Sequence, residues 1–207
     1  MPVRPTEFRW TAELAYVVGL LTTDGNLSPD GRHFDFTSKD YEQVALLKQL
    51  LNLDNRICQK PNGRGDLAYR IQFGSVALYR WLLEIGLMPN KSKVLGSLAV
   101  PDSYFFDFLR GHLDGDGTIS IYNDPQYPNS RRLYTRFLSA SLPHLQWLQS
   151  TLDRLLGISG AIDQKTRVWS LTLAKYDSLT LLPHLYYQPD LPCLQRKKAQ
   201  LAEFLNL

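Results

Sequence analysis

Two stretches of this chain resemble one another, and the likeness continues downstream of both. "AYVVGLLTTDG" begins at Ala15 and "FLRGHLDGDG" begins at Phe108, and each carries a glycine, a leucine and a final Asp-Gly pair at matching places. Further along, "RICQK" parallels "AIDQK" and "YRIQF" parallels "WSLTL". Such self-similarity is typical of a chain built from copies of one structural unit. The sequence therefore predicts two repeats, residues 1–100 and 101–207, with the extra residues of the second in the loop "YNDPQYPNSRR".

Each repeat shows the same order of hydrophobic patterns. In the first, residues 12–23 are apolar or small, which predicts a helix, and Gly25 is expected to end this helix in the left-handed conformation. Alternating residues in "HFDFTS", "RICQK" and "LAYRIQFGS" predict strands, while residues 40–52 and "VALYRWLLEIGL" predict amphipathic helices. The predicted fold class is α+β, an α-β-β-α-β-β-α unit present twice. Each unit would hold a four-stranded antiparallel sheet with helices on one face and the other face open.

Composition excludes several other classes of protein. The 207 residues are 44% hydrophobic, but no apolar run approaches the roughly 20 residues that a membrane span needs, and "MPVRPTEFRW" lacks a signal-peptide core. An intracellular location, bacterial cytoplasm or an organelle, is expected rather than secretion. The two cysteines and four histidines have neither disulfide-framework nor zinc-site spacing. A net charge of +3 permits a nucleic-acid partner.

Small residues recur at helical spacing on the first helix of each repeat. They are Ala15 and Gly19 in one copy, and Gly111 and Gly115 in the other. Small residues at this spacing let two helix backbones approach closely. The two helices are therefore predicted to pack against one another near a pseudo-twofold axis.

An aspartate lies at the predicted carboxyl end of each of these helices. Asp24 and Asp116 occupy matching places, whereas Asp114 is matched by Thr22. Two carboxylates at the negative ends of adjoining helices repel one another, and a hard divalent cation relieves that repulsion. Asp24 and Asp116 are therefore the predicted metal ligands. Asp114 is predicted to be replaceable by a neutral residue.

The two stretches "VVGLLTTDG" and "LRGHLDGDG" resemble the signature helices of a single-chain LAGLIDADG homing endonuclease. The resemblance covers nearly the whole chain, and departures such as Thr22, Thr23, Arg110 and His112 do not touch the final acid of either copy. It implies a monomeric pseudodimer that cleaves double-stranded DNA at a long asymmetric target and leaves short 3′ overhangs. It also implies that the two sheets form a DNA-binding saddle with the signature helices at the interface.

Hydrolysis of a phosphodiester requires an activated water and a stabilised leaving oxygen, and divalent ions held between carboxylates and phosphates supply both. The expected cofactor is Mg²⁺, with Mn²⁺ or Ca²⁺ able to replace it in binding. Asp24 and Asp116 are its expected ligands, and the backbone carbonyls of Thr23 and Gly115 are candidates for further ones. Because the protein offers so few ligands, the metal should bind weakly without DNA.

A lysine follows the last strands of each unit in the family. "PNKSKV" offers Lys91 and Lys93, and "LQRKKA" offers Lys197 and Lys198. The surroundings favour Lys91 and Lys197 as the residues that polarise the phosphate or organise water. A solvated helix face is the alternative for any of these lysines.

The open face of each sheet is the predicted DNA surface. Asp35 and Arg136 align on the second strands, either as polar support for the catalytic site or as base readers, with an ordinary surface acid as the alternative for Asp35. Arginine can form two hydrogen bonds to the edge of a guanine, and glutamine can form two to the edge of an adenine, while lysines mainly attract phosphates. The candidates are Arg32, Arg56, Gln59, Lys60, Arg64, Arg70 and Gln72 in the first repeat, and Arg131, Arg132, Arg136, Gln164, Lys165 and Arg167 in the second.

Two other functions are compatible with the same pattern. An intron RNA maturase would keep the basic surface without needing both acids, and a DNA-binding regulator would keep the fold without catalysis. Both aspartates are present, which favours cleavage. The leading hypothesis is a site-specific DNA endonuclease with no membrane partner and no obligate protein partner.

Overall fold

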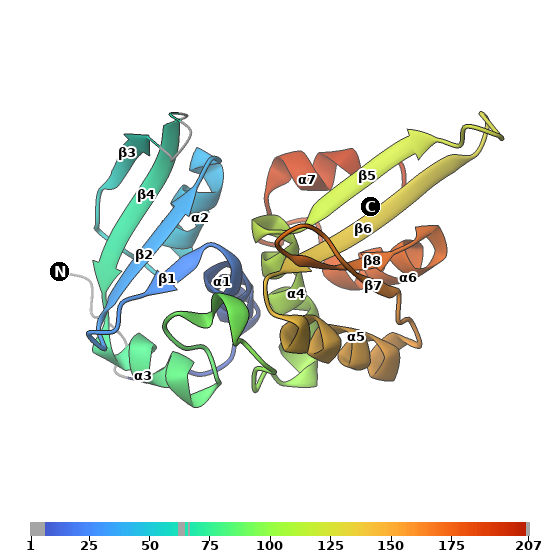
Figure 1. The fold of residues 1–207 in the computed structure, drawn as a ribbon. Helices are drawn as coiled ribbons and strands as arrows, with labels where there is room; N and C mark the ends of the chain where they lie inside the picture. Colours follow the sequence, from blue (N-terminus) through green and yellow to red (C-terminus); the bar gives the residue numbers. More distant parts are fainter. Residues whose placement is uncertain (1–6, 62–64, 66, 206–207) are drawn as a thin grey trace. The chain divides into compact units, whose positions relative to one another are not determined.

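The computed structural model describes residues 7–61, 65 and 67–205 of the chain. The chain divides into two compact units (Figure 1). The first unit comprises residues up to Lys91 together with Leu98–Gly111, and the second comprises Ser92–Ser97 together with residues from His112 onward. None of the helices in the described residues is long and apolar enough to cross a membrane.

The first unit contains one sheet and its covering helices. Its elements are α1 (Ala12–Thr23), β1 (Gly25–Leu27), β2 (His33–Ser38), α2 (Tyr41–Leu50), β3 (Ile57–Pro61), β4 (Leu67–Gly74), α3 (Val76–Glu84) and the 3₁₀ helix η2 (Asp102–Tyr104). The strands are antiparallel in the order β1-β2-β4-β3, and α2 packs on β2 and β4 (Figure 1). Along β2, Phe34 and Phe36 are buried while Asp35 and Thr37 are not, so one face is core and the other is open.

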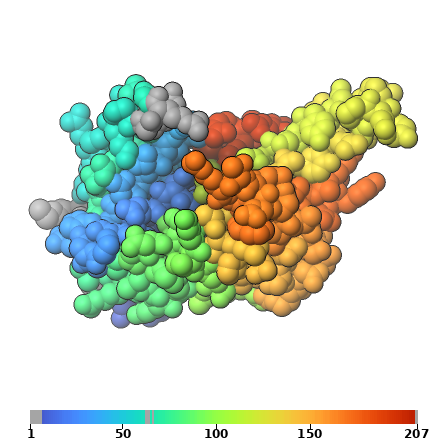
Figure 2. Space-filling view, viewed as in Figure 1, coloured from blue at the N-terminus to red at the C-terminus, as the bar shows by residue number. Residues whose placement is uncertain are grey.

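The second unit repeats this order. Its elements are β5 (Thr118–Asn123), β6 (Arg131–Ser139), α5 (Leu142–Leu156), β7 (Ala161–Gln164), β8 (Trp169–Leu173), α6 (Lys175–Leu185) and α7 (Gln195–Gln200). The sheet order is β5-β6-β8-β7, and α5 and α6 pack on β6 and β8. The loop between β5 and β6 projects from this unit (Figure 2). Two elements contain residues of both units, namely η1 (Lys91–Lys93) and α4 (Phe105–Gly115).

The strand register confirms the predicted duplication. Asn26 pairs with Asp35 between β1 and β2, and Thr118 pairs with Arg136 between β5 and β6. Asn26 and Thr118 each lie two places after the matched acid, and Asp35 and Arg136 are the matched residues of the second strands, so the two units share the same register. The predicted α+β class, with two four-stranded antiparallel sheets, is confirmed, while α7 is an additional short helix of the second half.

The prediction of a left-handed Gly25 is wrong. Gly25 begins β1 and does not belong to the glycines with positive φ. A Cβ atom at Gly25 would lie 2.6 Å from the Cα of Leu21, and a Cβ at Gly117 would lie 2.5 Å from the carbonyl oxygen of Leu113. Glycine is required at both places because the strand leaves its helix close to the last turn, not because of its φ angle.

The expected close approach of helices is present inside the first unit. A Cβ atom at Gly111 of α4 would lie 2.1 Å from the carbonyl oxygen of Tyr16 and 3.2 Å from the Cα of Gly19, both in α1. Real Cβ atoms do not approach backbone atoms at such distances, so the two helices are in contact through their backbones at this point.

We expect Gly111→Ala to destabilise the protein by about 3 kcal/mol or more, because a methyl group against a backbone carbonyl forces the helices apart. Urea unfolding followed by circular dichroism measures the loss. Gly96→Ala is the matched control, because a Cβ there meets no atom within 4 Å. Equal stability of the two variants would contradict the close contact between α1 and α4.

Candidate functional site

The two candidate metal ligands follow directly after helix ends. Asp24 is the C-cap residue of α1, and Asp116 comes immediately after Gly115, the last residue of α4. Asp24 is half-buried and Asp116 is exposed. Carboxyl ends of helices carry unsatisfied carbonyl groups and a partial negative charge, so a cation is favoured beside each acid. Their location at the helix ends agrees with the sequence analysis, and their binding of a metal stays a prediction.

Lys197 lies buried against the end of α4, with 5% of its surface exposed. Its Nζ donates hydrogen bonds to the carbonyl oxygens of Leu113 at 2.6 Å, Asp114 at 2.9 Å and Gly117 at 2.7 Å. It also lies 3.4 Å from the carbonyl oxygen of Gly115, one of the predicted metal ligands. The ammonium group thus satisfies carbonyls that the end of a helix leaves without a partner.

Lys91 occupies the corresponding place in the first unit. It is also buried, at 7% exposure, and its Nζ donates a hydrogen bond to the carbonyl oxygen of Gly25. Gly25 and Gly117 are matched residues of the two repeats, so the two lysines bind equivalent carbonyls. Lys93 is exposed, and Lys198 instead bonds the carbonyl of Pro189. Lys91 and Lys197 are therefore the members of their pairs that lie beside the helix ends.

Asp114 makes a contact that sequence alignment does not predict. Its side chain is buried, and its Oδ2 accepts a hydrogen bond of 2.7 Å from the backbone N–H of Leu194, the N-cap residue of α7. Thr22, the matched residue, donates to Val18 within its own helix at 2.7 Å. Asp114 thus joins α4 to the start of α7, and its replacement by a neutral residue stays a prediction. The comparison of the repeats carried no signal for this contact, because the matched Thr22 bonds within its own helix and the first repeat has only the three-residue 3₁₀ helix η1 at the place of α7.

The predicted metal ligands at each helix end are oxygen atoms. They are the Asp24 carboxylate and the Thr23 carbonyl in the first unit, and the Asp116 carboxylate and the Gly115 carbonyl in the second. Oxygen donors suit hard divalent cations such as Mg²⁺, Mn²⁺ and Ca²⁺. Within the described residues there is no cluster of three or more His, Cys, Asp or Glu side chains that could hold a metal.

The open face of the first sheet carries a linked group of polar side chains. Asp35 of β2 accepts hydrogen bonds at its Oδ2 from Arg70 Nε at 2.6 Å, from Arg70 Nη2 and from Gln72 Nε2 at 3.3 Å. Its Oδ1 accepts from Thr37 Oγ1 at 3.1 Å. Hydrogen bonding to Asp35 raises the pKa of Arg70. Asp35 thus contacts two predicted base readers, Arg70 and Gln72. Its predicted role in supporting the catalytic site stays a prediction.

The open face of the second sheet is built differently. Arg136 lies at the place of Asp35 and donates from Nη1 to Ser120 Oγ at 2.8 Å, with its guanidinium 5.0 Å from the centroid of the Tyr134 ring. Tyr134 stacks on Tyr122 at 6.0 Å. From the sequence these tyrosines could either contact the DNA backbone or pack against other side chains, and packing is the favoured interpretation. The alternation of buried and exposed positions along β6 would have predicted that Tyr134 lies on the open face, because Leu133 and Thr135 on either side of it are buried.

Arg132 ends this row of side chains. Its guanidinium donates to Asp124 Oδ2 at 2.6 Å and to the Tyr134 hydroxyl at 3.4 Å. The hydrogen bond from Arg132 lowers the pKa of Tyr134, and the bond to Asp124 raises the pKa of Arg132. Cationic and aromatic groups therefore alternate along the open side of β6, which is a surface that suits nucleic acid.

Three predicted readers do not lie on the open faces. Gln59 pairs directly with Tyr69, and Gln164 pairs with Trp169, so each shares the face of its partner, which is the helix-covered side of the sheet. Arg131 has the same parity as the buried residues of β6, and its Nη2 binds Glu203 at 2.8 Å. Their assignment to the open face is wrong because a side chain's face depends on strand register, and residue type does not determine it.

The remaining candidates lie on the open face or in turns. Lys60 pairs with Ala68 and so has the parity of Arg70, while Arg56 is exposed just before β3. Lys165 forms an ion pair with Asp163, and Arg167 is exposed in the same turn. Arg64 lies outside the described residues. These residues keep their predicted roles as untested candidates.

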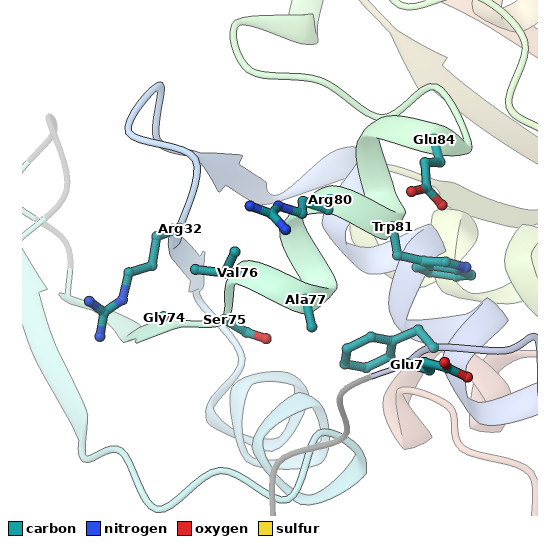
Figure 3. A pocket seen from close by; sticks show the side chains of 10 residues that line it. Glu7, Arg32, Gly74, Ser75, Val76, Ala77, Arg80, Trp81 and Glu84 are labelled. Carbon is teal, nitrogen blue, oxygen red and sulfur yellow. The ribbon is translucent and has the colours of Figure 1, made fainter.

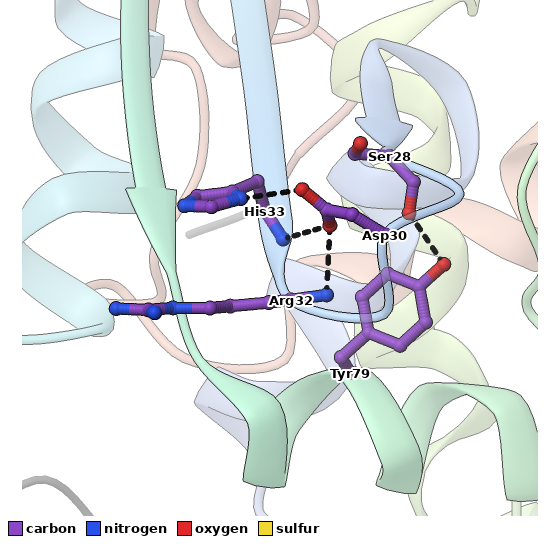
Figure 4. Close-up of polar contacts among 5 residues, drawn as sticks. All are labelled: Ser28, Asp30, Arg32, His33 and Tyr79. Carbon is purple, nitrogen blue, oxygen red and sulfur yellow. Dashed lines mark hydrogen bonds and ion pairs between the residues drawn. The ribbon is translucent and has the colours of Figure 1, made fainter.

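The turn between β1 and β2 holds Arg32 in place. Asp30 Oδ1 accepts hydrogen bonds from the backbone N–H groups of Arg32 at 3.0 Å and His33 at 2.9 Å, and its Oδ2 pairs with the His33 ring (Figure 4). These bonds lower the pKa of Asp30. Tyr79 donates to the carbonyl of Ser28 at 2.6 Å, which ties the turn to α3.

Arg32 also lines a shallow cavity of about 690 Å³ next to the start of α3 (Figure 3). Arg80 and Trp81 from α3 line the same cavity, together with Glu84. The two arginines, together with Glu7 and Glu84, give this cavity charges of both signs.

His112 is the buried histidine of the second signature helix. Its ring stacks on His144 at 5.3 Å and meets Phe137 edge-on at 5.8 Å. Burial, followed by the nearby His144 and Lys197, lowers the pKa of His112 well below its ordinary value of 6.5. The folded protein therefore binds fewer protons at this site than the unfolded chain does.

We expect the free energy of unfolding to fall by up to about 1.4 kcal/mol per pH unit as the pH drops below 6.5. The reason is that His112 becomes protonated in the unfolded chain but stays neutral in the folded protein, where its pKa is lowered. Urea unfolding at several pH values measures this slope. His112→Phe should flatten it, whereas His184→Gln, at an exposed position, should leave it unchanged. A slope that persists in His112→Phe would contradict the assignment.

The fold is that of LAGLIDADG proteins, with two four-stranded antiparallel sheets in a duplicated α-β-β-α-β-β-α unit. Full-length DUF199/WhiA from Thermatoga maritima matches with a TM-score of 0.60 and 15% identity, over 100% of this chain and 64% of that one. The homing endonuclease I-WcaI bound to its DNA recognition sequence matches with a TM-score of 0.62 and 12% identity, over 93% of this chain and 88% of that one. The meganuclease I-AabMI bound to uncleaved DNA gives 0.59 and 14%, over 94% and 89%.

These likenesses concern the fold. This chain spans 64% of the length of the DUF199/WhiA chain that it matches. No family model and no curated protein sequence matched the chain.

Proposed function

We propose that this chain is a site-specific DNA endonuclease that makes a double-strand break in a long asymmetric target and leaves short 3′ overhangs. The observation that carries the proposal is an arrangement present twice. Each signature helix ends next to an aspartate, Asp24 or Asp116, and the glycine after it binds a buried lysine through its carbonyl group. The likeness of the fold to homing endonucleases solved on DNA supports it.

In this proposal, Asp24 and Asp116 would each hold Mg²⁺ at the end of their helix. When bound, the metal supplies Lewis acidity and an activated water. Lys91 and Lys197 hold the backbone of the following glycine in place, which keeps each carboxylate at the same position relative to its helix end. Both repeats belong to one chain, so the protein would act as a monomer on an asymmetric site.

The proposed DNA surface comprises the open faces and the turns beside them. Several of its cations already have acidic partners, such as Arg70 with Asp35 and Arg132 with Asp124. Others form no ion pair within the described part of the chain and are the main candidates for phosphate contacts: Arg32, Arg56, Lys60, Arg136 and Arg167.

We expect log affinity for duplex DNA to fall linearly with log salt concentration, with a slope of about −4.5 if each of these side chains neutralises one phosphate. A fluorescence-anisotropy titration at several salt concentrations measures the slope. Arg136→Ala should reduce it by about 0.9. A flat dependence on salt would exclude these faces as the DNA surface.

The proposal is tested by selecting bound duplexes from a randomised pool and incubating them with the protein and Mg²⁺, with EDTA in a parallel reaction. Cleavage of both strands in Mg²⁺, and none in EDTA, is expected. Bound duplexes that remain intact with Mg²⁺ and with Mn²⁺ would overturn the nuclease activity.

A DNA-binding protein that does not cleave is the second candidate. The N-terminal domain of DUF199/WhiA is a LAGLIDADG domain, and full-length DUF199/WhiA matches over 100% of this chain. Lys91 and Lys197 also fit this reading, because their bonds to backbone carbonyls stabilise the fold whether or not the protein cleaves DNA. The same assay separates the two, since this candidate selects a sequence and leaves it intact.

A further inference from the structure

Asp35 joins two strands of the first sheet through side chains that point to its open face. It lies opposite Gln72 in the β2–β4 register, with Arg70 one pair further along that face. One carboxylate oxygen, Oδ2, accepts hydrogen bonds from both residues, and the other accepts from Thr37. The carboxylate is 19% exposed and the Arg70 side chain is 32% exposed, so the group is partly shielded but accessible from the open face.

The bonds to Asp35 leave Arg70 in one orientation. A guanidinium has five N–H donors in a rigid fork, and Asp35 takes the edge formed by Nε and Nη2. The remaining edge carries parallel N–H groups from Nη1 and Nη2, which is the pattern that bonds O6 and N7 of guanine. A charge-assisted bond to a carboxylate is stronger than a neutral one, so this orientation is present before any DNA arrives.

The same carboxylate decides which end of the Gln72 amide faces outward. The Nε2 group of Gln72 donates to Asp35 Oδ2 at 3.3 Å, since the amide oxygen would be repelled by the carboxylate. The side chain then offers its oxygen, an acceptor, to a ligand on the open face. In the major groove, the donors that an acceptor can bind are the exocyclic amines of cytosine and adenine.

We propose that Asp35 is a positioning residue that sets base specificity in the first unit, with a guanine read by Arg70 and a neighbouring cytosine or adenine read by Gln72. The inference rests on the proposed binding of DNA and goes beyond it by naming the bases. At the position matched to Asp35 the second unit has Arg136, which bonds Ser120. Its carboxylate-held arginine is Arg132, bonded to Asp124, so the two units place this kind of pair at different positions of their sheets.

The test compares the sequence preferences of the full chain and its variants on a randomised duplex pool, by sequencing the bound fraction. Arg70→Ala identifies the base pair whose guanine preference depends on Arg70. Asp35→Ala, and to a smaller extent Asp35→Asn, should lower the guanine preference at that same base pair by about tenfold or more. Preference for cytosine or adenine at the Gln72 position should relax in the same variants, while overall affinity is kept.

Two further variants complete the design. The Asp35→Ala, Arg70→Ala double variant should lose no more guanine preference than Arg70→Ala alone, because the aspartate acts through the arginine. Asp54→Asn removes an equal charge from an exposed position of the same unit and should keep the wild-type preferences. Thermal unfolding checks that every variant is folded. If Asp35→Ala does not fold, the isosteric Asp35→Asn replaces it in the test.

The outcomes separate this inference from the proposed function. If the wild-type chain selects a sequence and the Asp35 variants keep its guanine preference at the Arg70 base pair, the inference is overturned and DNA binding stands. Loss of all binding in folded Asp35→Asn also overturns it, since the aspartate would then contact the ligand itself. If the wild-type chain selects no sequence, the proposed function and the inference both fail.

Discussion

Replacing Asp24 or Asp116 by Asn is expected to lower the rate of strand cleavage by several orders of magnitude while DNA binding survives. Asparagine keeps the size of the side chain and removes the charge that would hold Mg²⁺. Binding without divalent ions should stay equal or become tighter, because a carboxylate within about 4 Å of a phosphate costs roughly 1 kcal/mol or more. Cleavage of a selected duplex under single-turnover conditions, together with anisotropy binding, measures both quantities.

The controls for this experiment follow from the structure. Asp114→Asn should keep far more cleavage than Asp116→Asn, because the asparagine oxygen can still accept the backbone N–H of Leu194. Asp54→Asn and Asp190→Asn remove charges from exposed positions of the first and second units and should keep wild-type cleavage. Wild-type cleavage by Asp24→Asn and Asp116→Asn would refute the assignment of these two acids.

Replacing Lys197 by Met is expected to destabilise the protein by about 3 kcal/mol or more. Methionine keeps most of the apolar stem but leaves the carbonyls of Leu113 and Gly117 without their donor, and each buried unsatisfied acceptor costs about 1–3 kcal/mol. Lys91→Met should also destabilise the protein, because it removes the donor of the matched carbonyl of Gly25. Guanidinium unfolding monitored by circular dichroism measures the loss.

The neighbouring lysine provides the comparison. Lys198 bonds the carbonyl of Pro189 at an exposed position, so Lys198→Met should change the stability by no more than about 0.5 kcal/mol. If Lys197→Met proves as stable as Lys198→Met, the buried ammonium does not stabilise the helix end. A loss of cleavage in Lys197→Met would then indicate that Lys197 acts directly on the DNA.

Local patterns in the sequence determined the helices, the strands and the ends of α1 and α4. Hydrophobic periodicity depends on residues close in the chain, and the duplication supplies each pattern twice. For this reason the α-β-β-α-β-β-α order and the place of Asp24 and Asp116 after their helices agree with the structure.

Contacts between residues far apart in the chain were decided only by the tertiary structure. Asp35 contacts Arg70 because β2 pairs with β4 and not with β3. No local sequence pattern predicts this strand order. Lys197 reaches Leu113 across 84 positions.

The faces of Gln59 and Gln164 are a further case. A shift of one residue in strand register moves a side chain to the other side of a sheet, and the residue type is the same in either register. The sequence by itself therefore determined the repeated units and where their acids lie. The tertiary structure decided which polar groups meet one another, because those meetings depend on strand order and register that only the packed chain defines.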